Sequence, residues 1–324
     1  MNESVDVSVV MLTYHHEEYV KQAIESVLQQ NTKYKYEIVI ADDYSTDNTR
    51  EIIRDYANNY PDIIRVIFND QNIGISANKY NACCHCKGRY IADLAGDDYW
   101  IDDSKIDMQV DFLESHVDYS AVATKIEARF DEDKKAFAVF PDKSICNKSV
   151  CLEDYLRYTK MVFPTNGIIM RNYYLTEEGR REFSIMPKAS PFIDDSTECI
   201  LLLRHGPVFV IDKTTAVYRV PRSKTDKHNY NSTGSTIGRV RKKIDLYNYL
   251  EKNLKPKLDF YHIYKSTLAV GIAECMRHTD SISHFKEIYR SVPERYKTRG
   301  ILLSIIPSVI HTVMSAIVLK IKAR

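Results

Sequence analysis

Residues 90–100 read YIADLAGDDYW, a stretch that changes abruptly from apolar to acidic. Tyr90 to Leu94 is typical of a buried β-strand, and the strand ends at Gly96-Asp97-Asp98. Two adjacent carboxylates are poorly placed in a core, where unpaired charges are costly. An exposed turn is one interpretation of the pair. Its position directly after a strand favours the other interpretation, a site for a divalent metal ion.

The sequence before this stretch repeats the same arrangement. Val5 to Leu12, Tyr36 to Ala41 and Ile64 to Phe68 are predicted strands, rich in apolar and β-branched residues. Helical spacing of apolar residues separates them, as between Val20 and Leu28. Strands and helices that alternate in short units predict a mostly parallel sheet with helices on both faces, an α/β fold.

Polar residues follow three of these strands. They are Thr13-Tyr14, Asp42-Asp43 and Asp97-Asp98. In open parallel sheets the ligand crevice lies at the carboxyl ends of the strands. We therefore expect polar groups from three segments to converge on one edge of the sheet.

The second half of the chain lacks this regular alternation. Ser120 to Phe130, Val162 to Met170 and Pro207 to Val220 are predicted strands of a mixed sheet. A polar loop is predicted from Ser223 to Ser235, and amphipathic helices from Arg239 to about Arg290.

These patterns predict three consecutive parts of the chain. They are a mixed α/β domain at 1–225 (with halves at 1–115 and 116–225), a helical extension at 226–298, and a C-terminal helix at 299–324.

Composition narrows the class of protein. The 324 residues are 44% hydrophobic and carry a net charge of +1, which does not indicate a nucleic-acid partner. The N-terminus lacks the basic and apolar pattern of a signal peptide. Seven cysteines, an odd number, are typical of reduced thiols. We therefore expect a cytoplasmic protein.

Two common nucleotide-binding motifs are absent from the sequence. It contains neither Gly-x-Gly-x-x-Gly nor Gly-x-x-x-x-Gly-Lys-Ser/Thr. A nucleotide held by carboxylates, with its diphosphate on Mg²⁺ or Mn²⁺, remains consistent, because these cations prefer oxygen ligands and bind phosphates.

Three motifs in order resemble those of inverting family 2 glycosyltransferases with the GT-A fold. Val7 to Tyr14 resembles the opening strand of the family, and Ile38 to Thr49 resembles its Asp-Asp-Gly-Ser-x-Asp-x-Thr. Residues 72–100 resemble its metal-binding segment. The resemblance covers about residues 5–220 and implies transfer of a sugar from a nucleotide-sugar donor. It also implies that residues 1–225 are a glycosyltransferase domain, with a nucleotide-binding half at 1–115 and an acceptor half at 116–225.

The resemblance also implies roles for individual residues in binding the donor. Tyr14, with the backbone near Thr13, would face the base, and Asp43 would bind the uracil or ribose with support from Asp42. The remaining predicted donor contacts are Asn78, Asp97 and Arg222.

The metal and the general base follow from the same resemblance. Asp97 and Asp98 would meet the diphosphate and the metal, with Asp98 as the preferred direct ligand. The base is expected before a helix, which favours Asp195, with Asp194 as the alternate. A plain helix N-cap is the structural alternative for this pair.

Other positions bear on the acceptor and on departures from the family. Thr165 and Asn166 are acceptor candidates. Ala95 stands where the family commonly has an acidic residue, and Pro221 replaces the His of its Tyr-Arg-x-His. Ala95 puts metal use in question, and the two departures together keep a non-catalytic binding protein open as an alternative.

We therefore predict an inverting transferase, with a UDP-sugar as the expected donor and a hydroxyl of a glycan or lipid-linked saccharide as acceptor, in bacterial surface polysaccharide synthesis. A non-catalytic protein that binds sugar nucleotides or carbohydrate is one alternative. A nucleotidyltransferase is another, although it would want a glycine-rich basic loop where Thr13 to Glu18 is acidic.

The C-terminal segment from Gly300 to Leu319 has no Asp, Glu, Lys or Arg. Ser304, Ser308 and His311 give it a narrow polar face at helical spacing. This pattern favours a helix lying in the membrane interface, on the inner face of the cytoplasmic membrane. Packing on this protein or on a second copy, as in a homodimer, and a membrane span remain alternatives.

Overall fold

The computed structural model describes residues 4–130, 135–157, 164–191, 195–220, 235–277, 281–298, 300–302 and 304–305. The chain divides into two compact units. The first contains residues 1–152 and 161–232, and the second contains 153–160 and 233–324. The predicted boundary near residue 225 stays a prediction.

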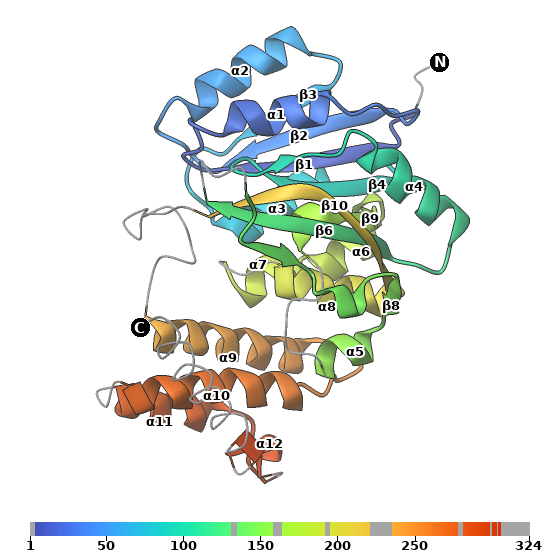
Figure 1. Ribbon diagram of the computed structural model, residues 1–324. Coiled ribbons are helices and arrows are strands. Elements are labelled where there is room, and N and C mark those ends of the chain that lie inside the picture. The colour runs from blue at the N-terminus through green and yellow to red at the C-terminus, as the bar shows by residue number, and fades with distance from the viewer. Residues whose placement is uncertain are drawn as a thin grey trace. The chain divides into compact units, whose positions relative to one another are not determined.

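A mixed sheet forms the centre of the first unit (Figure 1). Its main path runs β3-β2-β1-β4-β9-β6-β10-β5, with β7 paired to β6 and β8 paired to β10. The strands are β1 (Val7–Thr13), β2 (Tyr36–Asp42), β3 (Ile64–Phe68), β4 (Tyr90–Ala95), β5 (Tyr99–Trp100), β6 (Ala121–Phe130), β7 (Ala138–Phe140), β8 (Lys148–Val150), β9 (Ile168–Arg171) and β10 (Val208–Val220).

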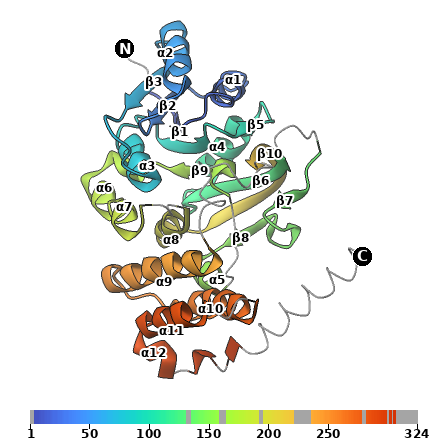
Figure 2. The ribbon, with the colours of Figure 1, turned by 90° about the vertical axis from the view of Figure 1, so that its left-hand side faces the viewer.

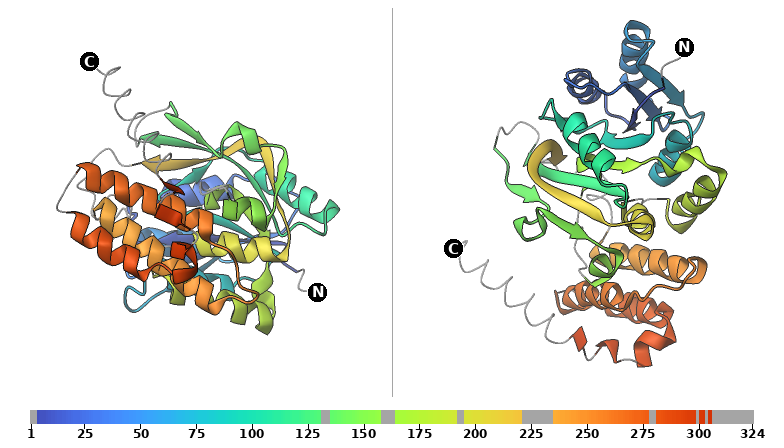
Figure 3. Two further views of the ribbon diagram at one scale, coloured as in Figure 1. Left: turned by 90° about the horizontal axis from the view of Figure 1, so that it is seen from below. Right: turned by 90° about the vertical axis from the view of Figure 1, so that its right-hand side faces the viewer.

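Strand direction divides this sheet into two halves. β3, β2, β1 and β4 are all parallel, as the sequence predicted. β9 then runs antiparallel between β4 and β6, whereas β10 lies parallel along β6 (Figure 3). The strand predicted from Val162 begins only at Ile168, because Thr165–Gly167 form a 3-10 turn; residues 162 and 163 lie outside the described residues.

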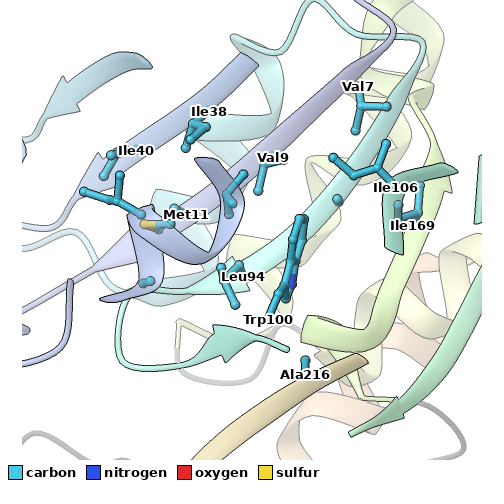
Figure 4. Close-up of a cluster of buried hydrophobic side chains, with 14 of the residues drawn as sticks. Val7, Val9, Met11, Ile38, Ile40, Leu94, Trp100, Ile106, Ile169 and Ala216 are labelled. Carbon is cyan, nitrogen blue, oxygen red and sulfur yellow. The ribbon is translucent and has the colours of Figure 1, made fainter. Parts of the chain in front are cut away.

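Helices cover both faces of the parallel half. Val7, Val9 and Met11 of β1 share one buried cluster with Ile24 and Ile106, from helices α1 and α4 (Figure 4). Helix α3 packs against β1 and β2 outside this cluster. The longer helices of this unit are α1 (Val20–Leu28), α2 (Thr49–Asn59), α3 (Ile75–Cys84), α4 (Lys105–Ser115), α6 (Glu177–Phe183), α7 (Ile185–Ala189) and α8 (Asp195–His205).

The second unit is helical, as predicted for residues 239–290. Its helices are α9 (Thr236–Asn253), α10 (Tyr261–Arg277), α11 (Ser281–Ser291) and α12 (Glu294–Thr298), while α5 (Leu152–Arg157) starts at the boundary between the units. α9 and α10 lie side by side (Figure 2).

The C-terminal segment is described only at its start. Ile301 and Ile305 are buried, and Tyr261 Oη donates to Ser304 Oγ at 3.0 Å, so these first residues pack on their own unit. Residues 306–324 lie outside the described residues. Across the part that is described, no helix is long and apolar enough to cross a membrane.

Candidate active site

Three strand ends lie in register at the carboxyl edge of the sheet. Thr13 of β1 is opposite Asp42 of β2, and Leu12 is opposite Ala95 of β4. The loops that follow these strands therefore start at the same level, and the predicted convergence of polar residues is present. The aspartates at this edge differ in the number of hydrogen-bond donors that surround each carboxylate.

Asp42 is a buried anchor of the edge. It is fully buried and accepts hydrogen bonds from Thr13 Oγ1 at 3.0 Å and from the Ser45 amide at 3.0 Å. The guanidinium of Arg50 forms an ion pair with the same carboxylate. These partners tie the end of β1 to the turn after β2, so Asp42 supports the edge rather than facing it.

Asp43 is also buried and multiply bonded. Its carboxylate accepts from Asn69 Nδ2 at 3.0 Å and from the amides of Ile73 and Gly74 at 2.8 and 2.9 Å. Asn69 also donates to Asn78 Oδ1 at 2.9 Å, and Asn78 is 1% exposed. Asp43 and Asn78 thus fix the loop before α3, and their predicted contacts with the donor stay predictions.

Asp98 is held from two distant segments. Asn166 Nδ2 and the backbone amide of Arg219 each donate to its carboxylate at 2.8 Å. Burial, followed by the neighbouring charge of Asp97, raises the pKa of Asp98 well above its ordinary value. In this arrangement both oxygens of Asp98 are engaged by the protein.

Asp97 is the open member of the pair. Its side chain is 33% exposed, and its carboxylate lies 3.8 Å from His16 Nε2. Gly96 lets the loop after β1 approach this turn closely. A Cβ there would lie 2.5 Å from Thr13 Cγ2 and 2.9 Å from His16 Nδ1, so the close approach requires glycine.

The residues fit a cation held mainly by substrate and water. Among the described residues, no three His, Cys, Asp or Glu side chains gather into a metal cluster. Mg²⁺ commonly takes only one or two carboxylates together with substrate phosphates and water. The exposure of Asp97 favours it over Asp98 as the direct ligand, the reverse of the sequence-based preference, and the assignment stays a prediction.

Arg219 is a residue that the sequence analysis did not select. Its Nη1 donates to the carbonyl of Asp97 at 2.6 Å, and its guanidinium lies over the rings of Tyr19 and Tyr99, 4.9 and 4.5 Å from their centroids. The Tyr-Arg pair at the end of β10 was the available signal. The selected Arg222 lies outside the described residues.

Helix α8 begins at Asp195, the predicted base, and Asp194 lies outside the described residues. A buried ammonium anchors this helix. Lys79 Nζ is 2.6 Å from Glu198 Oε2 on α8 and 2.8 Å from Asp93 Oδ2 on β4, and all three side chains are buried. One lysine therefore joins the strand that leads to Asp97 with the first turn of α8.

A second contact brings the segment before α8 to the same edge. The Ser76 amide donates to the carbonyl of Pro191 at 3.5 Å, and Pro191 also packs on Gly74, whose amide binds Asp43. Pro191, four positions before the first residue of α8, thus contacts the loop that surrounds Asp43. For the predicted acceptor residues, Thr165 is half-buried, while Asn166 is occupied with Asp98.

Comparison with known proteins agrees with this architecture. A model of the family described as glycosyl transferase family 2 matches residues 8–174. The chain belongs to glycosyl transferase family 2. This member of family 2 also has the GT-A fold. The structure of S. aureus TarS 1–349 in complex with UDP-GlcNAc superposes on it with a TM-score of 0.61. The two chains are 17% identical, and the match covers 91% of this chain and 83% of that one.

Another solved structure and several curated proteins are also similar to this chain. The mannosyltransferase PcManGT of Pyrobaculum calidifontis, in complex with GDP-Man and Mn²⁺, has a TM-score of 0.52 and 15% identity over 95% of this chain and 88% of its own. The Escherichia coli UDP-Glc:α-D-GlcNAc-diphosphoundecaprenol β-1,3-glucosyltransferase WfgD is 33% identical over 33% of this chain. An uncharacterised protein of Mycobacterium tuberculosis is 29% identical over 65%. The matches span 40% of WfgD and 58% of the mycobacterial protein.

Proposed function

We propose that this family 2 protein is an inverting glycosyltransferase that moves a sugar from a UDP-sugar to a hydroxyl of a glycan or lipid-linked saccharide. One observation carries the proposal. Asp97 presents an open carboxylate at the edge of the sheet, and Lys79 joins β4, the strand that leads to Asp97, to Glu198 in the first turn of α8, the helix that begins with Asp195.

The chemistry of this arrangement is a single displacement. Asp195 takes the proton of the acceptor hydroxyl, and the acceptor oxygen bonds to the anomeric carbon from the face opposite the leaving group. The bond between that carbon and the phosphate oxygen breaks, and the nucleoside diphosphate leaves. Inversion follows from one displacement, and no protein nucleophile is needed.

A divalent cation fits this mechanism at Asp97, with Asp98 behind it. When bound, Mn²⁺ or Mg²⁺ would neutralise charge on the diphosphate. Asp98 would keep the turn in place through Asn166 and Arg219, and Gly96 would keep the loop of β1 close. The presence of Mn²⁺ with PcManGT supports a divalent cation here.

The donor and acceptor classes rest on relatives. TarS is described with UDP-GlcNAc, and the name of WfgD specifies UDP-Glc and a diphosphoundecaprenol-linked saccharide. These names support a UDP-sugar donor, a lipid-linked acceptor and a role in surface polysaccharide synthesis. A lipid-linked acceptor in turn supports a place on the inner face of the cytoplasmic membrane.

A donor panel with and without metal tests the proposal. UDP-, GDP- and dTDP-sugars are screened by thermal shift with Mn²⁺, Mg²⁺ or EDTA, because a ligand at 100 times its dissociation constant stabilises by about 2.7 kcal/mol. The best donor is then assayed for transfer and for hydrolysis. We expect Asp195→Asn to abolish transfer while donor binding is retained.

Two outcomes would contradict the proposal. Binding of a sugar nucleotide without transfer or hydrolysis, unchanged in Asp195→Asn, would indicate a non-catalytic binding protein. Release of pyrophosphate from a nucleoside triphosphate and a sugar phosphate would indicate a nucleotidyltransferase.

Membrane attachment has its own test. The full chain and a chain ending at Ile305 are sedimented with vesicles of anionic and of neutral lipid. We expect the full chain to bind anionic vesicles more tightly than the shortened chain, because Lys320, Lys322 and Arg324 are basic. Equal binding by the two chains would exclude residues 306–324 as the anchor.

A further inference from the structure

Tyr44 has an unusual backbone conformation at the candidate donor edge. It directly follows Asp42 and Asp43, and its φ is +69°. Left-handed conformations put the Cβ of an L-residue close to the backbone, so a bulky side chain is disfavoured there and glycine is not. Within the described ranges, His15 and Asn147 are the other non-glycine residues with positive φ.

The turn explains the backbone conformation but not the side chain. Asp42 accepts a hydrogen bond from the Ser45 amide, two positions beyond Asp43, and the Asp43 amide bonds to Thr13. These bonds require the chain to reverse at Tyr44. Glycine would satisfy the same bonds without strain, so the tyrosine ring needs a separate reason.

Packing does not provide that reason. Tyr44 is 45% exposed. The Arg50 guanidinium lies over its ring, 5.4 Å from the centroid. Arg50 is itself fixed by Asp42, by the Asn69 carbonyl at 2.5 Å and by the ring of Phe68. A rigid cation thus orients an aromatic ring that remains largely open.

The surroundings of Tyr44 indicate what could cover the ring. Ser45 Oγ accepts from the His15 amide at 2.9 Å, which joins this turn to the loop that carries Tyr14. Asp43, the predicted contact of the base, already accepts from three protein donors. Tyr44, beside these aspartates, is an exposed aromatic ring, and such rings recognise planar bases by stacking.

We propose that Tyr44 is the stacking platform for the base of the nucleotide donor, and so contributes to the choice of donor. This inference rests on the proposed function and deepens it. The ring stacks on the face of the base, while Arg50 holds the ring in place. The strain at Tyr44 is then a cost of placing an aromatic side chain at a turn that favours glycine.

Nucleotide binding to a set of variants tests the platform. UDP, GDP and inorganic pyrophosphate are titrated with Mn²⁺ into the full chain and into Tyr44→Phe, Tyr44→Gly and Tyr44→Ala. We expect Tyr44→Phe to bind UDP within about twofold of the parent, and Tyr44→Gly to bind it roughly tenfold more weakly, since stacking of one base typically contributes this much or more. Pyrophosphate, which has no base, should bind all four proteins equally.

The unfolding temperatures of the variants show whether weaker UDP binding comes from loss of the stacking ring or from a destabilised fold. Tyr44→Gly removes the strained Cβ, so it should unfold at the same or a higher temperature than the parent, whereas Tyr44→Ala keeps the strain. Tyr60→Ala is the matched control, because Tyr60 is 41% exposed at the end of α2 but lies outside this edge. It should leave UDP affinity unchanged.

The possible outcomes distinguish failure of the stacking platform from failure of the proposed function. If the parent binds UDP and Tyr44→Gly binds it equally well, the platform is overturned while the proposed function stands. Equal weakening of UDP and pyrophosphate also overturns it, because the effect would then lie in the loop or the phosphate site. If the parent binds no nucleotide at all, the proposed function fails and the platform fails with it.

Discussion

Two Asp-Asp pairs lie on either side of β1, one at the end of β2 and one after β4, and they differ in how far their side chains are buried. Asp42 and Asp43 are both buried and bonded by protein donors. In the other pair, Asp98 is equally enclosed, but the side chain of Asp97 is one-third exposed. Identical dipeptides at neighbouring strand ends therefore differ in exposure according to how many protein donors surround them.

The difference separates enclosed charges from open ones. An enclosed charge is satisfied by the protein, and its loss leaves buried partners without a counterpart. An open charge is satisfied by solvent or ligand, and its loss affects the ligand more than the fold. Four predictions test this comparison.

The largest expected effect is on the open carboxylate. Asp97→Asn should lower metal-stimulated transfer by about 10²–10³-fold, because it removes the carboxylate that would hold the cation, and the cation would neutralise the charge that develops on the leaving group. The unfolding midpoint, followed by the fluorescence of Trp100, should not change. Trp100 is the single tryptophan and lies in the core of the first unit, so it reports this unit alone. A large loss of stability with residual transfer would break the comparison.

The reverse is expected for the enclosed pair. Asp42→Ala should lower the free energy of unfolding of the first unit by about 3 kcal/mol, because Arg50 and Thr13 lose a buried partner. Urea unfolding followed by Trp100 fluorescence measures this loss. Asp97→Ala is the matched control, and it should lower stability by less than about 0.5 kcal/mol, as substitutions away from packed features do. Equal losses would show that both pairs are structural.

Lys79, the buried lysine on α3, tests whether a buried ion pair contributes to activity by positioning the predicted base, Asp195. Glu198→Leu removes the bond from Lys79 to α8 but leaves the Lys79–Asp93 pair. We expect kcat to fall roughly tenfold while KM for the donor is kept, because a small displacement of Asp195 misaligns the base. Glu198→Gln retains an acceptor for Lys79 and should recover most of the activity.

Hydrogen exchange and a second variant control this prediction. Amides of residues 195–198 should exchange faster in Glu198→Leu than in the parent. Glu182→Gln removes the ion pairs with Arg204 and His205 at the other end of α8. If it lowers kcat as much as Glu198→Leu does, the effect reflects general loosening of α8 and not the placement of Asp195.

The fourth prediction concerns the pH dependence of stability. Burial lowers the pKa of Lys105 to about 7 in the folded protein, from 10.5. Between pH 7 and pH 10.5 the unfolded chain binds more protons than the folded protein does. The free energy of unfolding therefore rises with pH over this range, by at most about 1.4 kcal/mol per pH unit, and this gain is lost as the pH falls to about 7. Lys105→Met should remove this rise in urea unfolding at pH 7, 8 and 9. Lys148→Met, an exposed lysine, should preserve it.

Much of the fold follows from local pattern. The predicted strand from Ile64 to Phe68 and the predicted helix from Val20 to Leu28 have the predicted ends in the structure. The exact start of a helix is less evident from such a pattern. Ser104 precedes α4, and Asp102 accepts hydrogen bonds from the amide and hydroxyl of Ser104. Cap identity depends on the local turn, which apolar periodicity does not specify.

The sequence alone determined the alternation of strands and helices, the convergence of Thr13, Asp42 and Asp97 on one edge, and the family. Each depends on patterns within short windows, since strand ends of a parallel sheet must meet at one edge. Only the tertiary structure decided which carboxylate is open. The donors that enclose Asp98 come from Asn166 and Arg219, 68 and 121 positions away in sequence. Local pattern cannot supply such partners, because the packing of distant strands brings them together.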